Sequence, residues 1–389
     1  MSHYRSVGDV PRKRHTVHRD DSGDRLREEL MGTRGFAGPS ALLYHRHSPS
    51  DVRSVEAVDD LRRGHDSLRP NQPVTPLHLR TPDLGDDPSH DIVRHRRVLA
   101  GNADLTIAVV HASAESPLYR DVAGDELVYV ERGAARLESV FGPLAVGAGD
   151  YVVVPAGTTH RWIPDGAVRA LVVEMRGHVT FPDRYRGDNG QFLEHAPFCE
   201  RDLRAPTEPL LAEGRDIEVL VRTRDGLSVH RHATHPFDVV GWDGSLYPLA
   251  LSIRDFEPIV GSLHQPPPVH QTFAGPGFVV CSFVPRPFDF HPDAVKIPYH
   301  HSNVDSDEVL YYVDGDFMSR AGSGIGLGSM SIHPAGFVHG PQPGSYEGSV
   351  DAERTEETAV MIDTFAPLQI SDVARGIADD AYPRSWTED

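Results

Sequence analysis

Two histidines and one carboxylate in the last quarter of the chain have the spacing of a mononuclear metal site. His301 and Glu308 are 7 residues apart, and His339 follows 31 residues after Glu308. Two neutral imidazoles and one carboxylate leave coordination positions open on a divalent ion, and this donor set is typical of non-haem Fe(II) oxygenases. These three residues are therefore the candidate ligands of a catalytic metal, with Fe(II) as the first choice.

The sequence around these residues predicts the elements that must hold them together. The run EVLYYVDG, residues 308–315, combines β-branched and aromatic residues with a final Asp-Gly, which predicts a strand entering a tight turn. The run GSMSIHPAGFVH, residues 328–339, predicts a second short strand followed by a Pro-x-Gly turn. A histidine before the first strand, a carboxylate on it and a histidine after the turn can face one ion.

This pattern resembles the two sequence signatures of the cupin family. The first signature is matched by His301, Asn303, Glu308 and Gly315, and the second by Gly328, Pro334, Gly336 and His339. Asn303 stands where many cupins have another histidine. Because groups around a metal commonly orient its ligands, we expect Asn303 to act as a hydrogen-bond partner rather than as a ligand.

The same pattern occurs earlier in the chain, where it is damaged. Glu126 and residues 149–160, which end in His160, keep their places, but Tyr119 and Asp121 occupy the histidine positions. One histidine and one carboxylate make a poor site for a transition metal, so this unit is expected to be structural. Two similar units in one chain predict a bicupin.

Composition agrees with an all-β bicupin of two jelly-roll barrels, the first degenerate, with an N-terminal extension. The chain has 389 residues, 39% of them hydrophobic, with 35 Gly and 32 Pro, which suits many short strands joined by turns. Helical periodicity is confined to residues 24–31 and 370–381. We expect an extension packed on the barrels (1–95), the degenerate barrel (96–180), a connecting segment (181–235) and the metal-bearing barrel (236–389).

Charge and cysteine content narrow the class of partner. A net charge of -19 disfavours binding to nucleic acid or to an anionic membrane surface. Only Cys199 and Cys281 are present, so no disulfide framework is available. The N-terminus has no apolar signal core and no run is long enough to span a membrane. The sequence predicts a cytoplasmic protein that acts on a small molecule.

Several stretches are similar to homogentisate 1,2-dioxygenases. The likeness is carried by PYHHSNVDSDEVLYY, SIHPAGFVHGPQP and HPFDVVGWDG, and extends upstream through VFGPLAVGAGDYVVVPAGTTHRW and, more faintly, ELMGTRGFAGP and YPRSW. The resemblance implies Fe(II)-dependent cleavage of homogentisate by O2 to maleylacetoacetate, in tyrosine and phenylalanine catabolism. It also implies a homo-oligomer, a trimer or a hexamer.

The resemblance also assigns roles to individual residues. It implies that the three candidate ligands bind Fe(II) and that His264, in GSLHQPPPVH, is the catalytic base that removes the phenol proton of the substrate, a task suited to imidazole. It places His333 in the active site, and it makes His333, Tyr311 and Phe317 candidate substrate contacts.

One departure from the family concerns the substrate. The family has an arginine and a tyrosine where this chain has Asp314 and Phe317. An anionic residue in place of a guanidinium should weaken binding of an acetate group. Tyr311, Tyr312 or Arg320 could compensate.

Two other classes of function fit the same residues. The chain could be a gentisate-type dioxygenase or another metal cupin enzyme, such as an isomerase that uses Zn or Mn without O2. It could also be a non-catalytic bicupin that binds a small molecule. Oxygen consumption separates the enzymes, and metal content separates an enzyme from a scaffold.

Overall fold

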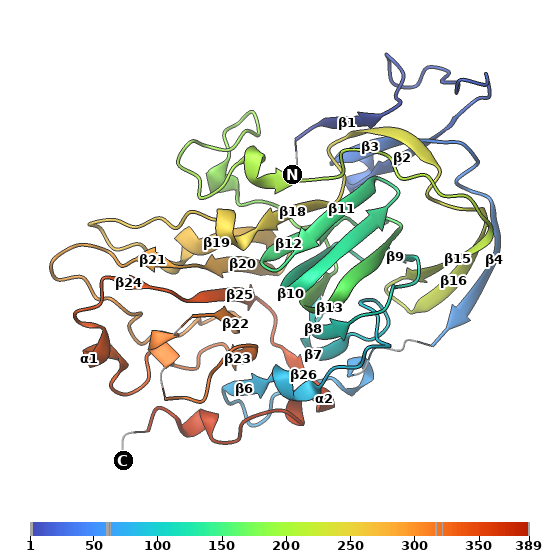
Figure 1. Ribbon diagram of the computed structural model, residues 1–389. Helices are drawn as coiled ribbons and strands as arrows, with labels where there is room; N and C mark the ends of the chain where they lie inside the picture. The colour runs from blue at the N-terminus through green and yellow to red at the C-terminus, as the bar shows by residue number, and fades with distance from the viewer. Residues whose placement is uncertain (1–2, 60–61, 63, 316, 321, 388–389) are drawn as a thin grey trace.

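The computed structural model describes residues 3–59, 62, 64–315, 317–320 and 322–387. In this part of the chain almost all regular structure is β-strand, and the α-helices are two short ones, α1 (Ser345–Ser349) and α2 (Asp372–Arg375). Neither helix has the length and apolar character needed to cross a membrane. Figure 1 shows two β units side by side, one drawn in teal and green and one in orange and red. The all-β bicupin prediction is confirmed.

The first unit is built on antiparallel strands of a 14-stranded sheet, in which β10 pairs with both β12 and β13. Successive side chains of a strand point to opposite faces. In β12, Tyr151 and Val153 enter one apolar core, and Val152 and Val154 enter another. Both faces of the sheet are therefore buried. The main strands are β7 (Arg97–Gly101), β8 (Leu105–Ala112), β10 (Glu126–Ser139), β11 (Gly142–Gly147), β12 (Asp150–Val154), β13 (His160–Met175) and β18 (Leu249–Ser252).

The N-terminal segment forms strands that complete these sheets. β1 (Arg5–Gly8), β2 (Arg27–Gly32), β3 (Ser40–His45) and β17 (Val239–Gly244) make a four-stranded sheet in the order β1-β17-β3-β2. The helix predicted over residues 24–31 is wrong. β2 pairs along its whole length with β3, and this long-range pairing overrides the local helical spacing of Leu26 and Leu30.

The segment expected to connect the barrels contains an ordered hairpin. β15 (Arg215–Arg222) and β16 (Leu227–Thr234) pair with each other, and they join β9 (Tyr119–Asp121) and β4 (Val52–Val58). Burial alternates along β15 as expected for a strand, because Val219 and Val221 are buried while the residues between and around them are not. A two-residue strand, β14 (Leu203–Arg204), borders β18.

The second unit contains a six-stranded sheet in the order β19-β20-β25-β22-β23-β6. Its edge strand β6 comes from the N-terminal quarter of the chain, whereas β26, near the C-terminus, pairs with β7 of the first unit. This exchange of strands ties the units together. The strands of this sheet are β6 (Leu77–Arg80), β19 (Gln271–Gly275), β20 (Phe278–Phe283), β22 (Asp307–Asp314), β23 (Ser329–His333) and β25 (Thr358–Thr364). The short strands β21 (Arg286–Pro287) and β24 (Arg354–Thr355) form a separate pair, and β26 (Gln369–Ile370) pairs with β5 (Arg69–Pro70) in the sheet of the first unit.

A buried histidine in β3 makes the stability of this fold depend on pH. His45 lies between Asp238, 2.6 Å from Nδ1, and Glu29, 3.0 Å from Nε2. Burial disfavours the charged imidazole, but hydrogen bonds and charge from Asp238 and Glu29 outweigh it and raise the pKa of His45 from 6.5 to about 9. Because the folded-state pKa is the higher one, this stabilisation is complete below pH 6.5 and is lost as the pH rises through about 9.

We therefore expect the free energy of unfolding to fall by on the order of 3 kcal/mol between pH 6.5 and a pH above 9, and His45→Gln to remove most of this slope. Urea unfolding at a series of pH values measures it. The control is His47→Gln, because His47 contacts the same Asp238 but is 55% exposed. An unchanged slope in His45→Gln would contradict the assignment.

Candidate metal centre

The second unit brings His301, Glu308 and His339 together. One ligand atom of each lies within 4.8 Å of those of the other two. The backbones of His301 and His339 bond to each other in both directions, at 2.8 and 2.9 Å. Glu308 lies at the start of β22, and the turn after β23 includes Gly336 in the left-handed conformation, at φ 74°. The strand and the Pro-x-Gly turn predicted from the sequence are both present.

Backbone carbonyls fix the tautomers of the two histidines. Nδ1 of His301 lies 2.9 Å from the Tyr299 carbonyl oxygen, and Nδ1 of His339 lies 2.9 Å from that of Phe337. A carbonyl only accepts, so each Nδ1 carries the proton and each Nε2 presents a lone pair. These Nε2 atoms lie 3.8 Å and 3.3 Å from Glu308. The two Nε2 lone pairs and the Glu308 carboxylate are all acceptors, so they need a cation between them.

Two further observations fit a metal ion at this point. Nε2 of His339 is buried and has no hydrogen-bond partner in the described part of the chain. Burial alone would raise the pKa of Glu308, but the imidazoles of His301, His333 and His339 hold it well below its ordinary value, so the carboxyl is anionic. Glu308 in turn raises the pKa of His301, so a proton and a metal ion compete for that Nε2.

His333 forms a hydrogen bond with the Glu308 carboxylate. Its Nδ1 lies 2.9 Å from Glu308 Oε1 and its Nε2 lies 2.9 Å from the Tyr382 hydroxyl. Burial lowers the pKa of His333 to about 3, so the ring is neutral. Since an ionised Glu308 only accepts, Nδ1–H donates to it and Nε2 accepts from Tyr382. His333 is fully buried, and in this geometry its hydrogen bond constrains the direction of the Glu308 carboxylate.

Shortening this chain of hydrogen bonds should weaken the metal site without removing a ligand. We expect Tyr382→Phe to lower Fe(II) affinity by about tenfold and His333→Ala by ~10–100-fold, because supporting groups typically contribute this much. Competition with a metal chelator measures it. Tyr346→Phe is the control, since Tyr346 is 51% exposed. Equal affinity in all these variants would exclude the supporting role.

A cavity of about 270 Å³ adjoins the centre on the side of His301. The His301 side chain is 32% exposed, whereas those of Glu308 and His339 are at most 7% exposed, so the centre opens towards this cavity. His264 lines the cavity with its Nδ1 3.2 Å from Asp289 Oδ2. The other lining groups are apolar or cationic for the most part and include Ile259, Val260, His270, Phe283, Arg286, Phe288, Lys296, Ile297, Tyr299 and Asn303.

The structure places Tyr311 and Phe317 away from this cavity. Strand alternation puts Tyr311 on the face of β22 opposite to Glu308, and its hydroxyl donates to Glu131 of the first unit. The Phe317 ring is buried edge-on against Tyr312, with a centroid distance of 4.9 Å. Arg320 is also buried and donates to Tyr312 and to the Gly340 carbonyl. The residues expected to touch substrate therefore pack around the centre.

His270 and Tyr382 were not among the predicted site residues. His270 ends the GSLHQPPPVH stretch that also contains His264, and it is buried against Phe283 with a ring-centroid distance of 4.7 Å. The sequence offered 23 histidines and no local reason to choose this one. Tyr382 lies 49 residues beyond His333, so only the fold brings them together.

The first unit has a counterpart of the centre in which arginines supply the positive charge. His160 Nε2 lies 3.4 Å from Glu126, as His339 does from Glu308, at 3.3 Å. However, the buried guanidinium of Arg96 donates to both Glu126 and Glu174. A metal is not needed to balance the carboxylates here.

The remaining charges of this cluster are also balanced. Asp121, Glu126 and Glu174 have ligand atoms within 4.8 Å of one another, an arrangement that could otherwise attract an ion. Arg222 joins Asp121 at 2.9 Å and Glu174 at 2.8 Å, and Arg62 also pairs with Glu174. Three guanidinium groups thus face three carboxylates in a buried site.

Comparisons with known proteins agree with this geometry. The family model for the homogentisate 1,2-dioxygenase N-terminal region matches residues 42–253, and that for the C-terminal region matches residues 252–388. A Saccharolobus solfataricus protein, provisionally described as a dioxygenase, is 38% identical over 99% of each chain. Homogentisate 1,2-dioxygenase of Emericella nidulans is 26% identical over 82% of this chain and 70% of its own length.

Among solved structures, a cupin 2 conserved barrel domain protein from Leptotrichia buccalis is 8% identical and covers 76% of this chain and 99% of its own, with a TM-score of 0.35. The family models together span residues 42–388 and include both units and all three candidate ligands. The chain therefore belongs to the homogentisate 1,2-dioxygenase family and is a ring-cleaving dioxygenase.

Proposed function

We propose that this protein is an Fe(II)-dependent dioxygenase that inserts both atoms of O2 into homogentisate or a closely related hydroquinone-type ring. With homogentisate the product is maleylacetoacetate, an intermediate of tyrosine and phenylalanine catabolism. The observation that carries the proposal is the convergence of two imidazole Nε2 lone pairs and one anionic carboxylate beside a cavity that fits a small aromatic molecule.

In this proposal His301, Glu308 and His339 hold the iron. Fe(II), when bound, supplies the redox chemistry that lets a phenolic ring react with O2. The chain supplies one negative charge and two neutral donors, which is the set expected for non-haem Fe(II) oxygenases. His333 and Tyr382 fix the direction of the Glu308 carboxylate.

His264 is proposed to take the phenol proton as the substrate binds. The Asp289 carboxylate accepts a hydrogen bond from Nδ1–H, so the ring lone pair that can take a proton is on Nε2. His264 and His301 line the same cavity, so the base and the metal can meet one substrate.

The cavity offers a cation for the acid group of such a substrate. Lys296 lines it, and its ammonium donates to the Asp289 carbonyl at 3.3 Å but pairs with no carboxylate in the described residues. Arg286, by contrast, has Glu357 at 3.4 Å. Asp314 is exposed at the end of β22 and does not line the cavity. We propose that Lys296 takes over the role of the arginine that Asp314 replaces.

We expect His264→Ala to keep bound iron and to lower kcat by about 10²–10⁴-fold, the usual contribution of a general base. Steady-state turnover together with iron content measures both quantities. His291→Ala is the control, because His291 is an exposed residue of the same region that does not line the cavity. Normal turnover of the iron-loaded His264→Ala protein would remove His264 from the mechanism.

The substrate is tested by oxygen uptake after anaerobic reconstitution with Fe(II). Homogentisate, gentisate and hydroquinone are compared, and we expect the fastest uptake with homogentisate. Uptake with gentisate alone would change the substrate, and no uptake with any of them would favour a metal isomerase or a binding protein. Activity with Zn or Mn in the absence of O2 would identify the isomerase.

We also propose that the protein is a cytoplasmic homo-oligomer, a trimer or a hexamer. Both cysteines are free, which suits a reducing compartment. Three apolar side chains near the metal-side cavity, Leu263, Tyr299 and Val304, are 58–80% exposed and would be covered by another subunit. Light scattering after size exclusion gives the mass, and a monomer would contradict this proposal.

A further inference from the structure

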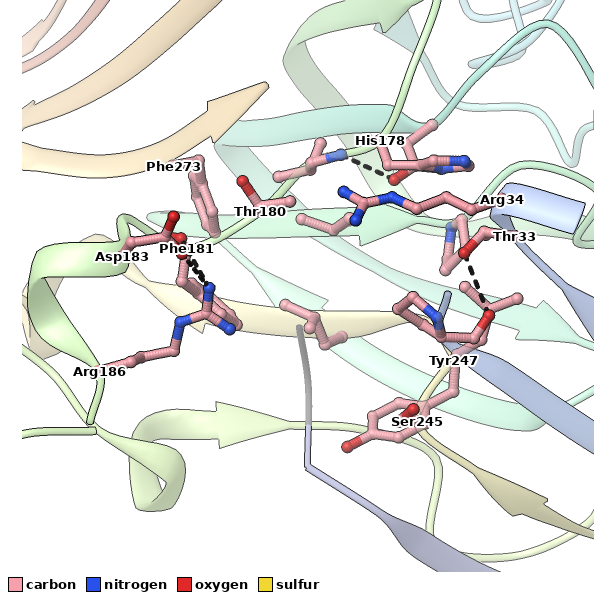
Figure 2. Close-up of a pocket in the computed structure, with 17 residues that line it drawn as sticks. Thr33, Arg34, His178, Thr180, Phe181, Asp183, Arg186, Ser245, Tyr247 and Phe273 are labelled. Atoms are coloured by element: carbon pink, nitrogen blue, oxygen red, sulfur yellow. Dashed lines mark hydrogen bonds and ion pairs between the residues drawn. The ribbon is translucent and has the colours of Figure 1, made fainter. Parts of the chain in front are cut away.

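A second cavity lies apart from the metal centre, where the N-terminal segment, the first unit and the second unit meet. Its volume is about 270 Å³, and it shares no lining residue with the metal-side cavity. Its walls come from the turn between β2 and β3, the end of β12, the segment after β13, the turn before β18 and Phe273 of β19 (Figure 2).

One wall presents an arginine. Figure 2 shows the Arg34 side chain reaching over the pocket from the β2–β3 turn. In the described part of the chain no carboxylate or carbonyl binds this guanidinium. Arg34, Gly35 and Phe36 have φ values of 52, 59 and 67°, and Thr33 bonds to Pro39 and Gly38 across the turn. Consecutive left-handed residues are uncommon and are often found at ligand sites.

A second arginine lines the opposite side. Arg186 is 13% exposed, and its Nη2 donates to Asp183 Oδ1 at 2.7 Å and to the Phe181 carbonyl at 3.4 Å. Its Nε is buried and has no partner within the described residues. The side chain of Asp183 is 99% exposed, so solvent screens its charge and the pair neutralises Arg186 only in part.

The Asp125 carboxylate, which lines the pocket, already has hydrogen-bond partners in the protein. Asp125 accepts hydrogen bonds from the backbone N–H groups of Ala156 and Val179 and lies 3.0 Å from Nδ1 of His178. The bond to Asp125 raises the pKa of His178 and so favours its cationic form. On a chain of net charge -19, a pocket with two under-neutralised guanidinium groups is suited to an anion.

The remaining wall is apolar. The rings of Phe181 and Phe273 lie 5.8 Å apart, and Val153, Leu246 and Leu249 complete the surface. We propose that this pocket binds a small organic carboxylate, with its carboxylate held by Arg34 and Arg186 and its apolar body against Phe181 and Phe273. Guanidinium groups match carboxylates in geometry, and the volume suits a molecule with a single ring.

Isothermal titration of the full-length, iron-loaded protein with phenylacetate tests the proposal. We expect saturable binding, with benzyl alcohol and inorganic phosphate each at least about tenfold weaker, because one lacks the charge and the other lacks the apolar body. Arg34→Asn and Arg186→Gln should each weaken phenylacetate binding at least about tenfold. Asparagine tolerates the left-handed backbone at position 34, so this variant should fold, and its thermal midpoint checks that.

Two controls locate the binding. Arg224→Asn removes an exposed arginine in the turn between β15 and β16, and it should leave the affinity unchanged. His301→Ala should also leave it unchanged, because the metal centre belongs to the other cavity. The proposal is overturned if phenylacetate does not bind, if Arg34→Asn binds it normally, if phosphate binds as tightly, or if only His301→Ala abolishes binding.

Discussion

Replacing His339 by alanine is expected to remove most bound iron and all measurable ring cleavage. The His339 side chain is 1% exposed, and its Nε2 lies 3.3 Å from Glu308 and has no hydrogen-bond partner in the described residues. Removing it leaves one imidazole and one carboxylate, which is too few donors for a stable site. The loss in Fe(II) affinity should exceed the ~10–100-fold that supporting groups contribute.

Iron content after anaerobic reconstitution measures this loss, and oxygen uptake measures activity. His160→Ala is the matched control, since His160 holds the corresponding position beside Glu126 in the first unit. We expect that variant to bind as much iron as the parent protein, because Arg96 already neutralises Glu126 there. If His339→Ala keeps its iron and its full activity, the ligand assignment is wrong.

Arg96→Met is expected to destabilise the fold by ~3–5 kcal/mol, the range found when one partner of a buried ion pair is removed. The Arg96 side chain is 1% exposed and lies between Glu126 and Glu174, which are equally buried. Its electrostatic environment raises its pKa, because the two carboxylates outweigh the penalty of burial. Methionine fills part of the volume but leaves their charge without this cation.

The free energy of unfolding in urea measures the effect. Arg94→Met is the control, because Arg94 makes a similar ion pair with Asp91 but is 43% exposed, so its loss should cost at most about 1 kcal/mol. An Arg96→Met protein as stable as the control would show that the cluster contributes little to the first unit.

The proximity of the three candidate ligands could be predicted because it depends on local structure. Glu308 lies on a strand that its β-branched residues indicate, and His339 follows a turn that Pro334 and Gly336 indicate. Alternation along that strand also limits the tyrosines: only one of Tyr311 and Tyr312 can share the face of Glu308, and the structure places Tyr312 there.

Contacts between distant segments could not be predicted in this way. Arg96 is 30 residues from Glu126 and 78 from Glu174, so nothing in its neighbourhood in the sequence indicates a buried ion pair. The strand over residues 27–32 also depends on a distant segment, because its hydrogen bonds go to β3 whereas its own sequence favours a helix. A single sequence indicates local conformational preferences, whereas the Arg96 ion pairs and the pairing of β2 with β3 form only in the folded chain.

The most direct test of the proposed function is the mass of the product formed from homogentisate under labelled O2. The iron-loaded protein should give a ring-opened product that contains both labelled oxygen atoms, and His301→Ala should give none. A product with one labelled atom, or with an intact ring, would contradict the assignment of this site as the centre of a homogentisate-type dioxygenase.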